Sequence, residues 1–460
     1  MPDAVLDLVI VEGPVLITVY VIAGVLFAYL LCREASVRWA LTALVVMFVG
    51  GMVGGAVLWA SVHVLDLFGG PVSDAAWLWV PGAFAACTLA VWNLWRSRWW
   101  RKVIALLSIP VFAATAMLGI NADYALDRTL GDLLDISTAA PLDIRDPGVD
   151  PPPADPAEPL YTTWTAPPGM PTHGEVGYPV PAVPNTISGF PARRAELYLP
   201  PAALVEDPPR LPLVIMMMGQ PGSPDATFIA EALDDLAAEH DGLAPIALVI
   251  DQLGDPTVDP LCLDTELGQV ETYVMQDVLP WARLHLNVLQ GPTFTTVAGY
   301  SNGGGCAAYF GAKYPESFGN IVAVAPTEYA GVERSSEVLA DVFGGDQAAY
   351  DEVKPVTIME AKAPYPDSAA IFAVGERDRA FQPGTHRLAD AATAAGMDAA
   401  YVEVPDAGHD AAALTGGLEE GFALLTTRMG LAPPEGDPPA EGEAPAEGDP
   451  PAEGTPAPED

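Results

Sequence analysis

Four long apolar stretches at the start of the chain constrain its fold more than any other feature. They run from about 6 to 32, 37 to 62, 75 to 95 and 102 to 121. Each could form a membrane-spanning helix, which takes roughly 20 apolar residues. A soluble domain with four buried helices fits such a succession poorly. A cleaved signal peptide also fits poorly, because no Lys or Arg precedes Arg33. We therefore expect a four-span transmembrane region over residues 1–122.

The charges of the loops predict how these spans are oriented. The loop after the first span carries Arg33 and Arg38, and four basic residues surround the start of the fourth span: Arg96, Arg98, Arg101 and Lys102. The N-terminus and the loop after the second span have no Lys or Arg, so the basic loops should face the cytoplasm. We therefore expect a multi-pass plasma-membrane protein whose N-terminus, and everything after about residue 122, lie outside. Six tryptophans cluster near the span ends, where interfacial indoles are expected: Trp77, Trp79, Trp92, Trp95, Trp99 and Trp100.

The rest of the chain divides into three parts by composition. Residues 123–187 include the acidic "PLDIRDPGVDPPPADPAEP", which lacks periodicity and indicates an extended extracytoplasmic linker. Residues 432–460 contain "GDPPAEG" twice and almost no bulky apolar side chain, so we expect a disordered acidic tail. The formal charge of −40 argues against nucleic acid as a partner, because a phosphate binder needs clustered Lys and Arg.

Residues 188–431 alternate between strand-like and helix-like runs. "RLPLVIMMMG", "APIALVID", "TFTTVAGY", "FGNIVAVAP" and "AAIFAVGE" are short apolar runs typical of buried strands. "DATFIAEALDDLAAEH" and "VETYVMQDVLPWARLHL" have apolar residues at helical spacing. This alternation predicts one α/β domain with a mainly parallel sheet flanked by helices.

The segment "VAGYSNGGGCAAYF", residues 297–310, places Ser301 where a strand turns sharply into a helix. Gly299-Tyr300-Ser301-Asn302-Gly303 fits the pattern G-x-S-x-G, whose glycines permit a strained turn that exposes the serine hydroxyl at the carboxyl edge of a sheet. The alternative is a polar residue in a Gly-rich turn. The strand–turn–helix context favours a nucleophile.

A serine nucleophile needs a base and an orienting acid, expected here in the chain order Ser, acid, His. His409 in "VEVPDAGHDAAAL" follows a strand and a Gly-containing loop, whereas His386 begins a helix-like run that should face solvent. We therefore expect His409 to be the general base. Asp378 lies just past the buried strand of "IFAVGERD" and is the expected acid, with Glu376 and Glu328 as alternatives.

The transition state of acyl transfer needs two backbone N–H donors, which form an oxyanion hole. Asn302, the residue after the nucleophile, should supply one, and the loop after "VIMMMG" should supply the other. Pro221 has no N–H, so Gln220 is the candidate. The alternative is that "GQPGSP" is only a turn.

From about 190 to 430 the chain resembles the putative esterase (esterase D-like) family of α/β-hydrolases, which includes feruloyl and enterochelin esterases and the mycolyltransferases of actinobacteria. The resemblance rests on "RRAELYLPPAAL" leading to "RLPLVIMMMG", on "TTVAGYSNGGGCAAYFGAKYPESFGNIVAVAP", on "FAVGERD" and on "GHD". It implies Ser301 as nucleophile, His409 as base and Asp378 as acid. Many members have His-Gly where this chain has Met218-Gly219. The four-span start resembles actinobacterial membrane-anchored esterases of the same general type.

Two of the four cysteines, Cys262 and Cys306, fall in the outer domain, where a disulfide could persist. Such a bond would stabilise the fold by roughly 4 kcal/mol in the chain-entropy model and would brace the helix after Ser301. The alternative is two buried free thiols. The sequence has no zinc-type spacing of Cys and His, no P-loop and no dinucleotide fingerprint, so we expect neither a metal nor a cofactor.

Together these features predict a membrane-anchored extracytoplasmic serine esterase. We expect it to hydrolyse carboxylic esters through an acyl-enzyme, with lipid or envelope-glycolipid esters as substrates. An acyltransferase with the same triad is one alternative, and a non-catalytic membrane-anchored binding or scaffold module is another. The pattern does not indicate an oligomeric state.

Overall fold

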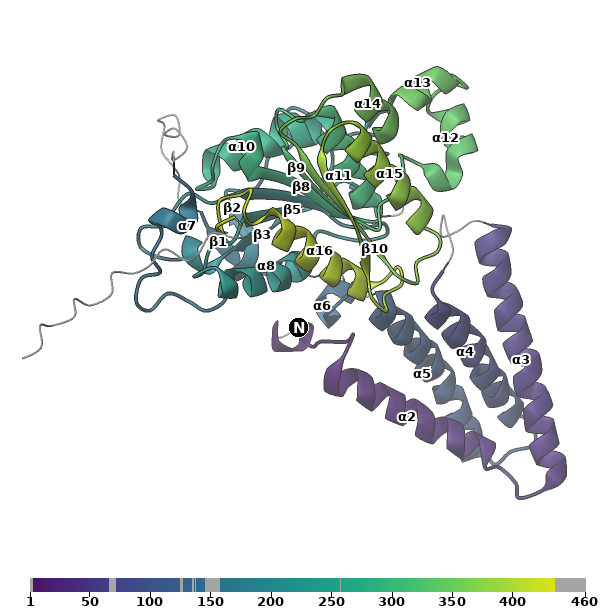
Figure 1. Cartoon of the computed structure of the whole chain (residues 1–460). Coiled ribbons are helices and arrows are strands. Elements are labelled where there is room, and N and C mark those ends of the chain that lie inside the picture. The colour runs from purple at the N-terminus through teal and green to yellow at the C-terminus, as the bar shows by residue number, and fades with distance from the viewer. Residues whose placement is uncertain are drawn as a thin grey trace, which may run out of the picture.

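A computed structural model of the chain describes residues 3–65, 72–124, 127–134, 136, 138–144, 158–256 and 258–434. Most of the expected tail and the centre of the expected linker lie outside these ranges. The described part forms a bundle of apolar helices that leads into an α/β domain (Figure 1).

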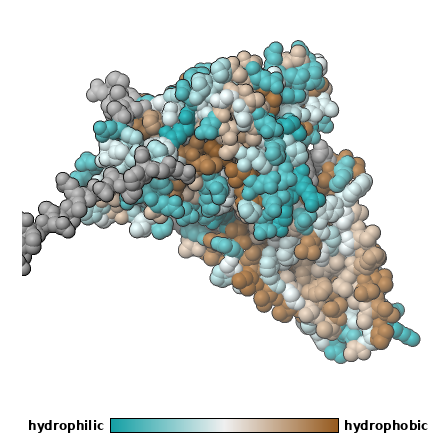
Figure 2. Space-filling view, viewed as in Figure 1, coloured by the Kyte–Doolittle hydropathy of each residue, from teal (hydrophilic) through white to brown (hydrophobic). Residues whose placement is uncertain are grey.

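Among the described residues, four helices are long and apolar enough to cross a membrane, as the sequence predicts: α2 (Gly13–Leu31), α3 (Val37–His63), α4 (Asp74–Asn93) and α5 (Trp99–Tyr124). Large apolar side chains point outward along them, such as Phe48 at 67% and Leu78 at 71% exposure. Figure 2 shows the bundle as mainly apolar beside a more polar domain. Outward apolar side chains on all four helices are typical of contact with lipid.

Glycines of α3 allow a close contact with α4. A Cβ added to Gly54 would lie 2.8 Å from Cβ of Phe84 on α4, and one added to Gly50 would overlap Thr88. The "FVGGMVGGAVLW" pattern therefore marks the face of α3 that packs on α4.

A sheet of nine described strands forms the centre of the domain, in the order β1-β2-β3-β5-β4-β8-β9-β10-β11. Strands β2 and β3 pair antiparallel, as do β3 and β5, while the remaining neighbours are parallel. The strands β4, β5, β9 and β10 are buried along their whole length, which is why they read as continuous apolar runs. The strands are β1 (Pro141–Asp143), β2 (Glu175–Val180), β3 (Glu196–Leu199), β4 (Leu213–Met217), β5 (Ile246–Ile250), β8 (Thr295–Tyr300), β9 (Asn320–Val324), β10 (Ala369–Gly375) and β11 (Asp398–Val404).

Helices cover both faces of this sheet (Figure 1). The helices α8 and α16 pack together on one face, and α11, α14 and α15 pack on the other. The larger helices of the domain are α8 (Thr227–Glu239), α10 (Leu279–His285), α11 (Asn302–Lys313), α12 (Ser335–Asp341), α13 (Gln347–Glu352), α14 (Pro355–Lys362), α15 (Gln382–Ala394) and α16 (Ala411–Leu425). The expected α/β architecture is therefore present.

The sheet begins earlier in the chain than residue 188, where the sequence predicts the domain to start. Strands β1 and β2 and the short helix α7 (Leu160–Thr163) all lie within 123–187. The Tyr161 amide donates to the Gly430 carbonyl at 3.1 Å, which ties this segment to the end of the domain. The difference arises because these strands are short and contain proline, as in "EVGYPV", and therefore give no clear periodicity.

Candidate active site

Ser301 lies in a strained turn between β8 and α11. Its backbone has φ 54° and ψ −115°, a conformation that L-residues rarely adopt, and its amide donates to the Val324 carbonyl at 2.9 Å. The side chain lies at the carboxyl edge of the sheet, with the residue 9% exposed. This is the geometry expected of a nucleophile at a sharp strand-to-helix turn.

Glycines on both sides make this turn possible. A Cβ added to Gly299 would lie 2.7 Å from the Gly304 nitrogen, and one added to Gly303 would lie 2.6 Å from the Met218 carbonyl oxygen. Both obstacles are main-chain atoms, which cannot rotate away. The two glycines of the G-x-S-x-G pattern therefore allow α11 to approach the ends of β4 and β8.

His409 joins Ser301 to Asp378. Its Nε2 lies 2.9 Å from Ser301 Oγ, and its Nδ1 lies 2.8 Å from Asp378 Oδ2. A carboxylate can only accept, so Nδ1 carries the proton and Nε2 is free to accept from the serine hydroxyl. The ring lies between Tyr300, with centroids 5.1 Å apart, and Phe381, at 4.0 Å. This stacking and the bond to Asp378 fix the direction of Nε2.

The loop that carries His409 is held against the end of β10. The Arg377 amide donates to the Ala407 carbonyl at 2.8 Å, and a Cβ on Gly375 would lie 2.6 Å from that same carbonyl oxygen. Asp410 caps α16 by accepting from the Ala413 amide at 3.1 Å, so the aspartate of "GHD" anchors the loop.

Asp378 is the acid that the structure brings to His409. It is 5% exposed, and its second carboxylate oxygen accepts from the Phe381 amide at 3.2 Å. The two alternative acids lie elsewhere: Glu376 accepts from the Asp406 amide at 3.0 Å, and Glu328 accepts from Arg387 Nε at 2.8 Å. His386 is exposed on α15 and stacks on Tyr401.

The surroundings of Tyr300 connect the site to the membrane region. Burial raises the pKa of Tyr300 well above its usual value, and the charges of Asp410 and Asp378 add to the rise. Tyr124 and Asp123, at the end of α5, also lie close enough to raise it further. Tyr300 is therefore a neutral phenol, and the last turn of α5 lies near the candidate nucleophile.

Two segments carry the expected oxyanion donors beside Ser301. Asn302 is the first residue of α11, where amides have no acceptor within the helix. The loop with Gln220 passes close by, because a Cβ on Gly219 would lie 3.3 Å from Ser301 Cβ. The structure therefore brings both candidate segments to the nucleophile.

The sequence reasoning missed two side chains that hold these segments. Gln252 Nε2 donates to the Met218 carbonyl at 2.6 Å and to Asn302 Oδ1 at 3.1 Å. Arg193 donates to the Gly222 carbonyl at 2.6 Å. The local signal for Gln252 was its position directly after the strand-like run "APIALVID".

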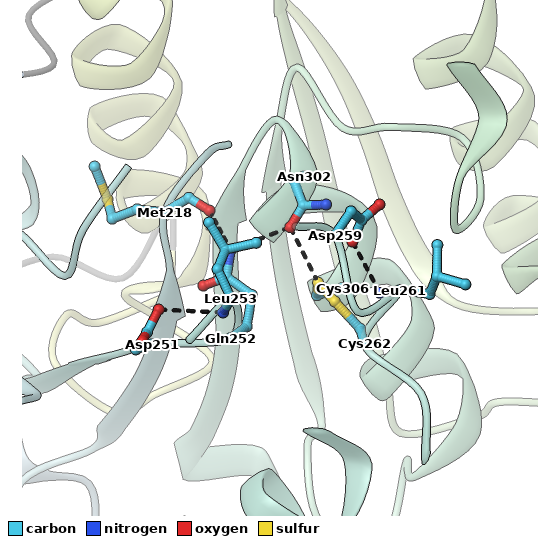
Figure 3. Close-up of a disulfide and its surroundings, with 9 residues drawn as sticks. All are labelled: Met218, Asp251, Gln252, Leu253, Asp259, Leu261, Cys262, Asn302 and Cys306. Atoms are coloured by element: carbon cyan, nitrogen blue, oxygen red, sulfur yellow. Dashed lines mark hydrogen bonds between the residues drawn. A yellow bond between two sulfur atoms is a disulfide. The ribbon is translucent and has the colours of Figure 1, made fainter. Parts of the chain in front are cut away.

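Cys262 and Cys306 form a disulfide, with Cα atoms 5.6 Å apart and 44 positions between them in sequence (Figure 3). The bond ties the loop after β5 to the second turn of α11. It lies beside Asn302, whose Oδ1 is 3.9 Å from Cys306 Sγ. The pairing that the sequence suggested is therefore the one that the structure has.

Several known proteins are similar to this chain in sequence or in structure. Residues 192–413 match the family described as Putative esterase, a range that includes Ser301, Asp378 and His409. An uncharacterised protein of Corynebacterium glutamicum is 28% identical over 352 residues, which cover 74% of this chain and 79% of that protein. An S-formylglutathione hydrolase structure from Agrobacterium tumefaciens is 16% identical with a TM-score of 0.45, and the match covers 57% of this chain and 98% of that one. A ferulic acid esterase structure from Anaeromyces mucronatus is 18% identical with a TM-score of 0.40, with coverages of 52% and 86%.

Proposed function

We propose that Ser301, His409 and Asp378 are the catalytic triad of a serine ester hydrolase, because residues 192–413 match the Putative esterase family. The observation that carries the proposal is the continuous pair of contacts from Ser301 Oγ through the imidazole to the Asp378 carboxylate, at 2.9 and 2.8 Å. Three residues from three strand ends meet in the order and tautomer that nucleophilic catalysis needs.

The proposed reaction has two halves. Ser301 Oγ attacks the ester carbonyl carbon while His409 Nε2 takes its proton, and the amides of Asn302 and Gln220 hold the oxyanion. The imidazolium then donates its proton to the departing alcohol, which leaves an acyl-serine. A water molecule, deprotonated by the same imidazole, attacks this ester and releases the acid. Asp378 keeps the imidazole oriented and stabilises its charged form.

We further propose that the four apolar helices anchor the domain in the plasma membrane, with the domain on the outer side. The support for the orientation is the placement of basic residues in the two loops assigned to the cytoplasm. The Tyr124 hydroxyl accepts from the Ser73 amide at 2.7 Å, so the ends of α4 and α5 that face the domain are tied together.

The placement of the site supports a lipid or envelope-glycolipid ester as substrate. Arg128, just after α5, pairs with Glu231 of α8 at 2.9 Å and lies over the Phe228 ring. The end of α5 also lies near Tyr300, next to Ser301. The carboxyl edge of the sheet therefore faces the end of the bundle (Figure 1). An ester whose chains stay in the outer leaflet would reach Ser301 from that side.

The test is ester hydrolysis by the full chain in detergent and in lipid nanodiscs, with short- and long-chain p-nitrophenyl esters. We expect Ser301→Ala to lower kcat by roughly 10⁴-fold or more and to abolish labelling by a fluorophosphonate probe. Ser336→Ala, an exposed serine of α12, is the control and should retain both. A folded wild-type chain that neither hydrolyses these esters nor reacts with the probe would favour the scaffold alternative. Product transfer to an added sugar or lipid alcohol would favour the acyltransferase.

A further inference from the structure

Gln252 is a buried polar side chain that the proposed chemistry does not use. It lies directly after β5 and is 2% exposed. Its amide nitrogen makes two hydrogen bonds, to the Met218 carbonyl at 2.6 Å and to Asn302 Oδ1 at 3.1 Å (Figure 3). A buried amide is costly unless its hydrogen bonds are made, so its two acceptors indicate what it holds.

Both acceptors belong to the segments that carry the oxyanion donors. Met218 precedes the Gly219-Gln220 loop, and Asn302 supplies the other donor from its own backbone. One side-chain NH₂ group therefore spans the two segments. We propose that Gln252 is a positioning residue that sets the spacing of the oxyanion hole.

The directions of the amide groups follow from their partners. A backbone carbonyl only accepts, so the NH₂ of Gln252 faces Met218, and its second hydrogen is directed to Asn302 Oδ1. The NH₂ of Asn302 is then left for the Asp259 carboxylate, which is hydrogen-bonded to it and also accepts from the Leu261 amide at 2.8 Å. The Asn302 side chain is thus held on both sides.

The main chain around Gln252 is itself fixed. Asp251 is 1% exposed and accepts from the Leu253 amide at 3.1 Å and the Gly254 amide at 3.0 Å. It also pairs with Arg193 at 2.8 Å, and Arg193 donates in turn to the Gly222 carbonyl at the far end of the oxyanion loop. Gln252 therefore projects from a rigid base toward a loop that has no sheet partner beyond Met217.

This arrangement matters because oxyanion donors act only within a narrow distance. They must lie about 2.7–3.1 Å from the developing oxyanion, and loss of one donor lowers kcat by about 10²–10³-fold. Without Gln252, the Gln220 loop and the Asn302 turn lose the side chain that hydrogen-bonds to both of them. Substrate binding in the ground state depends much less on that spacing, so the effect should fall on kcat.

The test, which rests on the proposed function, is Gln252→Leu in the full chain, with Gln252→Asn as the milder variant because its amide is one carbon short of both acceptors. For Gln252→Leu we expect kcat to fall about 10²-fold with KM within about threefold of wild type. Affinity for a trifluoromethyl ketone, which forms a tetrahedral adduct on the serine, should fall by a similar factor. If Gln252→Leu does not fold, the same measurements on Gln252→Asn decide the question, with a smaller loss of kcat expected.

The control is Asn320→Leu, a fully buried amide at the opposite edge of the sheet, which donates to the Thr293 carbonyl at 2.7 Å. It should lower the melting temperature but leave kcat of the folded protein unchanged. Wild-type kcat and ketone affinity in the folded Gln252 variant would overturn this inference alone. A wild-type chain with no Ser301-dependent hydrolysis would overturn the proposed function and this inference together.

Discussion

Gly303→Ala tests whether the close approach of α11 to β4 is what positions Ser301. The added Cβ would lie 2.6 Å from the Met218 carbonyl oxygen, and nearer still to the main chain of Met217. Ordinary contact begins at 3.4 Å, so α11 would have to move away from β4 by at least about 0.8 Å. The obstacles are main-chain atoms of a central strand, so β4 cannot yield easily.

That displacement would carry the nucleophile and the Asn302 amide with it. A misplacement of about 1 Å lowers the rate by about 10²-fold, and overpacking of this kind destabilises a fold by about 1–3 kcal/mol. We therefore expect a loss of roughly 10²-fold in kcat/KM for a p-nitrophenyl ester, together with a lower melting temperature. Gly384→Ala, in α15, is the control, because its Cβ would lie 3.1 Å from the Glu328 Cβ and no nearer than 3.8 Å to the Glu328 main chain. If Gly303→Ala keeps wild-type kcat/KM, the reasoning from backbone contact is wrong.

Three further predictions concern the acid, the pH dependence and the contact between bundle and domain. Asp378→Asn should lower kcat about 10⁴-fold by favouring the wrong imidazole tautomer. Glu376→Gln should have little effect on kcat. Equal losses of kcat in these two variants would refute the assignment of Asp378 as the acid. Burial raises the pKa of the Glu196 carboxyl to about 7 from 4.5, so the folded state binds this proton more tightly than the unfolded state does. The stabilisation that the bound proton gives is complete below about pH 4.5 and is lost as the pH rises through about 7. Relative to Glu196→Gln, the free energy of unfolding of the wild type should therefore fall by up to about 3 kcal/mol between pH 4.5 and 8, and parallel curves from denaturant titrations would contradict this. Arg128→Glu should slow hydrolysis of a bilayer-embedded ester severalfold but not that of a soluble short-chain ester. Adding Glu231→Arg should restore the rate with the bilayer-embedded ester. An equal effect of Arg128→Glu on both esters would count against a membrane-facing site.

The parts of the site that could be predicted are those encoded in a short stretch of sequence. Ser301 is the predicted nucleophile because the glycines that its turn requires are its immediate neighbours. His409 is the predicted base because it follows the last strand-like run in a loop. Asp378 could not be separated from Glu376, because two residues in one turn project in different directions and only the folded loop decides which one meets the imidazole.

The missed features depend on contacts between distant segments. Gln252 acts on Asn302, 50 positions away in the sequence, and nothing in its local pattern distinguishes it from a polar residue at a strand end. Strand β2 was missed because its proline and those that follow it resemble those of a spacer, although it pairs with both β1 and β3. Pairing of this kind is decided by the neighbouring strand, which local propensity does not reveal.

The contact between the bundle and the domain changes what the membrane anchor would do. A flexible spacer alone would leave the site facing in all directions, so anchoring would raise the local concentration of substrate without orienting the enzyme. In this chain, the segment after α5 is held at both ends: the Asn121 side chain pairs with Asp127 at 2.7 and 2.9 Å, and Arg128 pairs with Glu231. A single exposed ion pair contributes at most about 1 kcal/mol. The orientation of the domain must therefore also depend on apolar packing of the segment after α5, where Leu130 packs against the cluster of Ile10, Leu16 and Leu118. We therefore expect the anchor to act as an orienting element, whose loss would be felt by membrane-embedded esters and not by soluble ones.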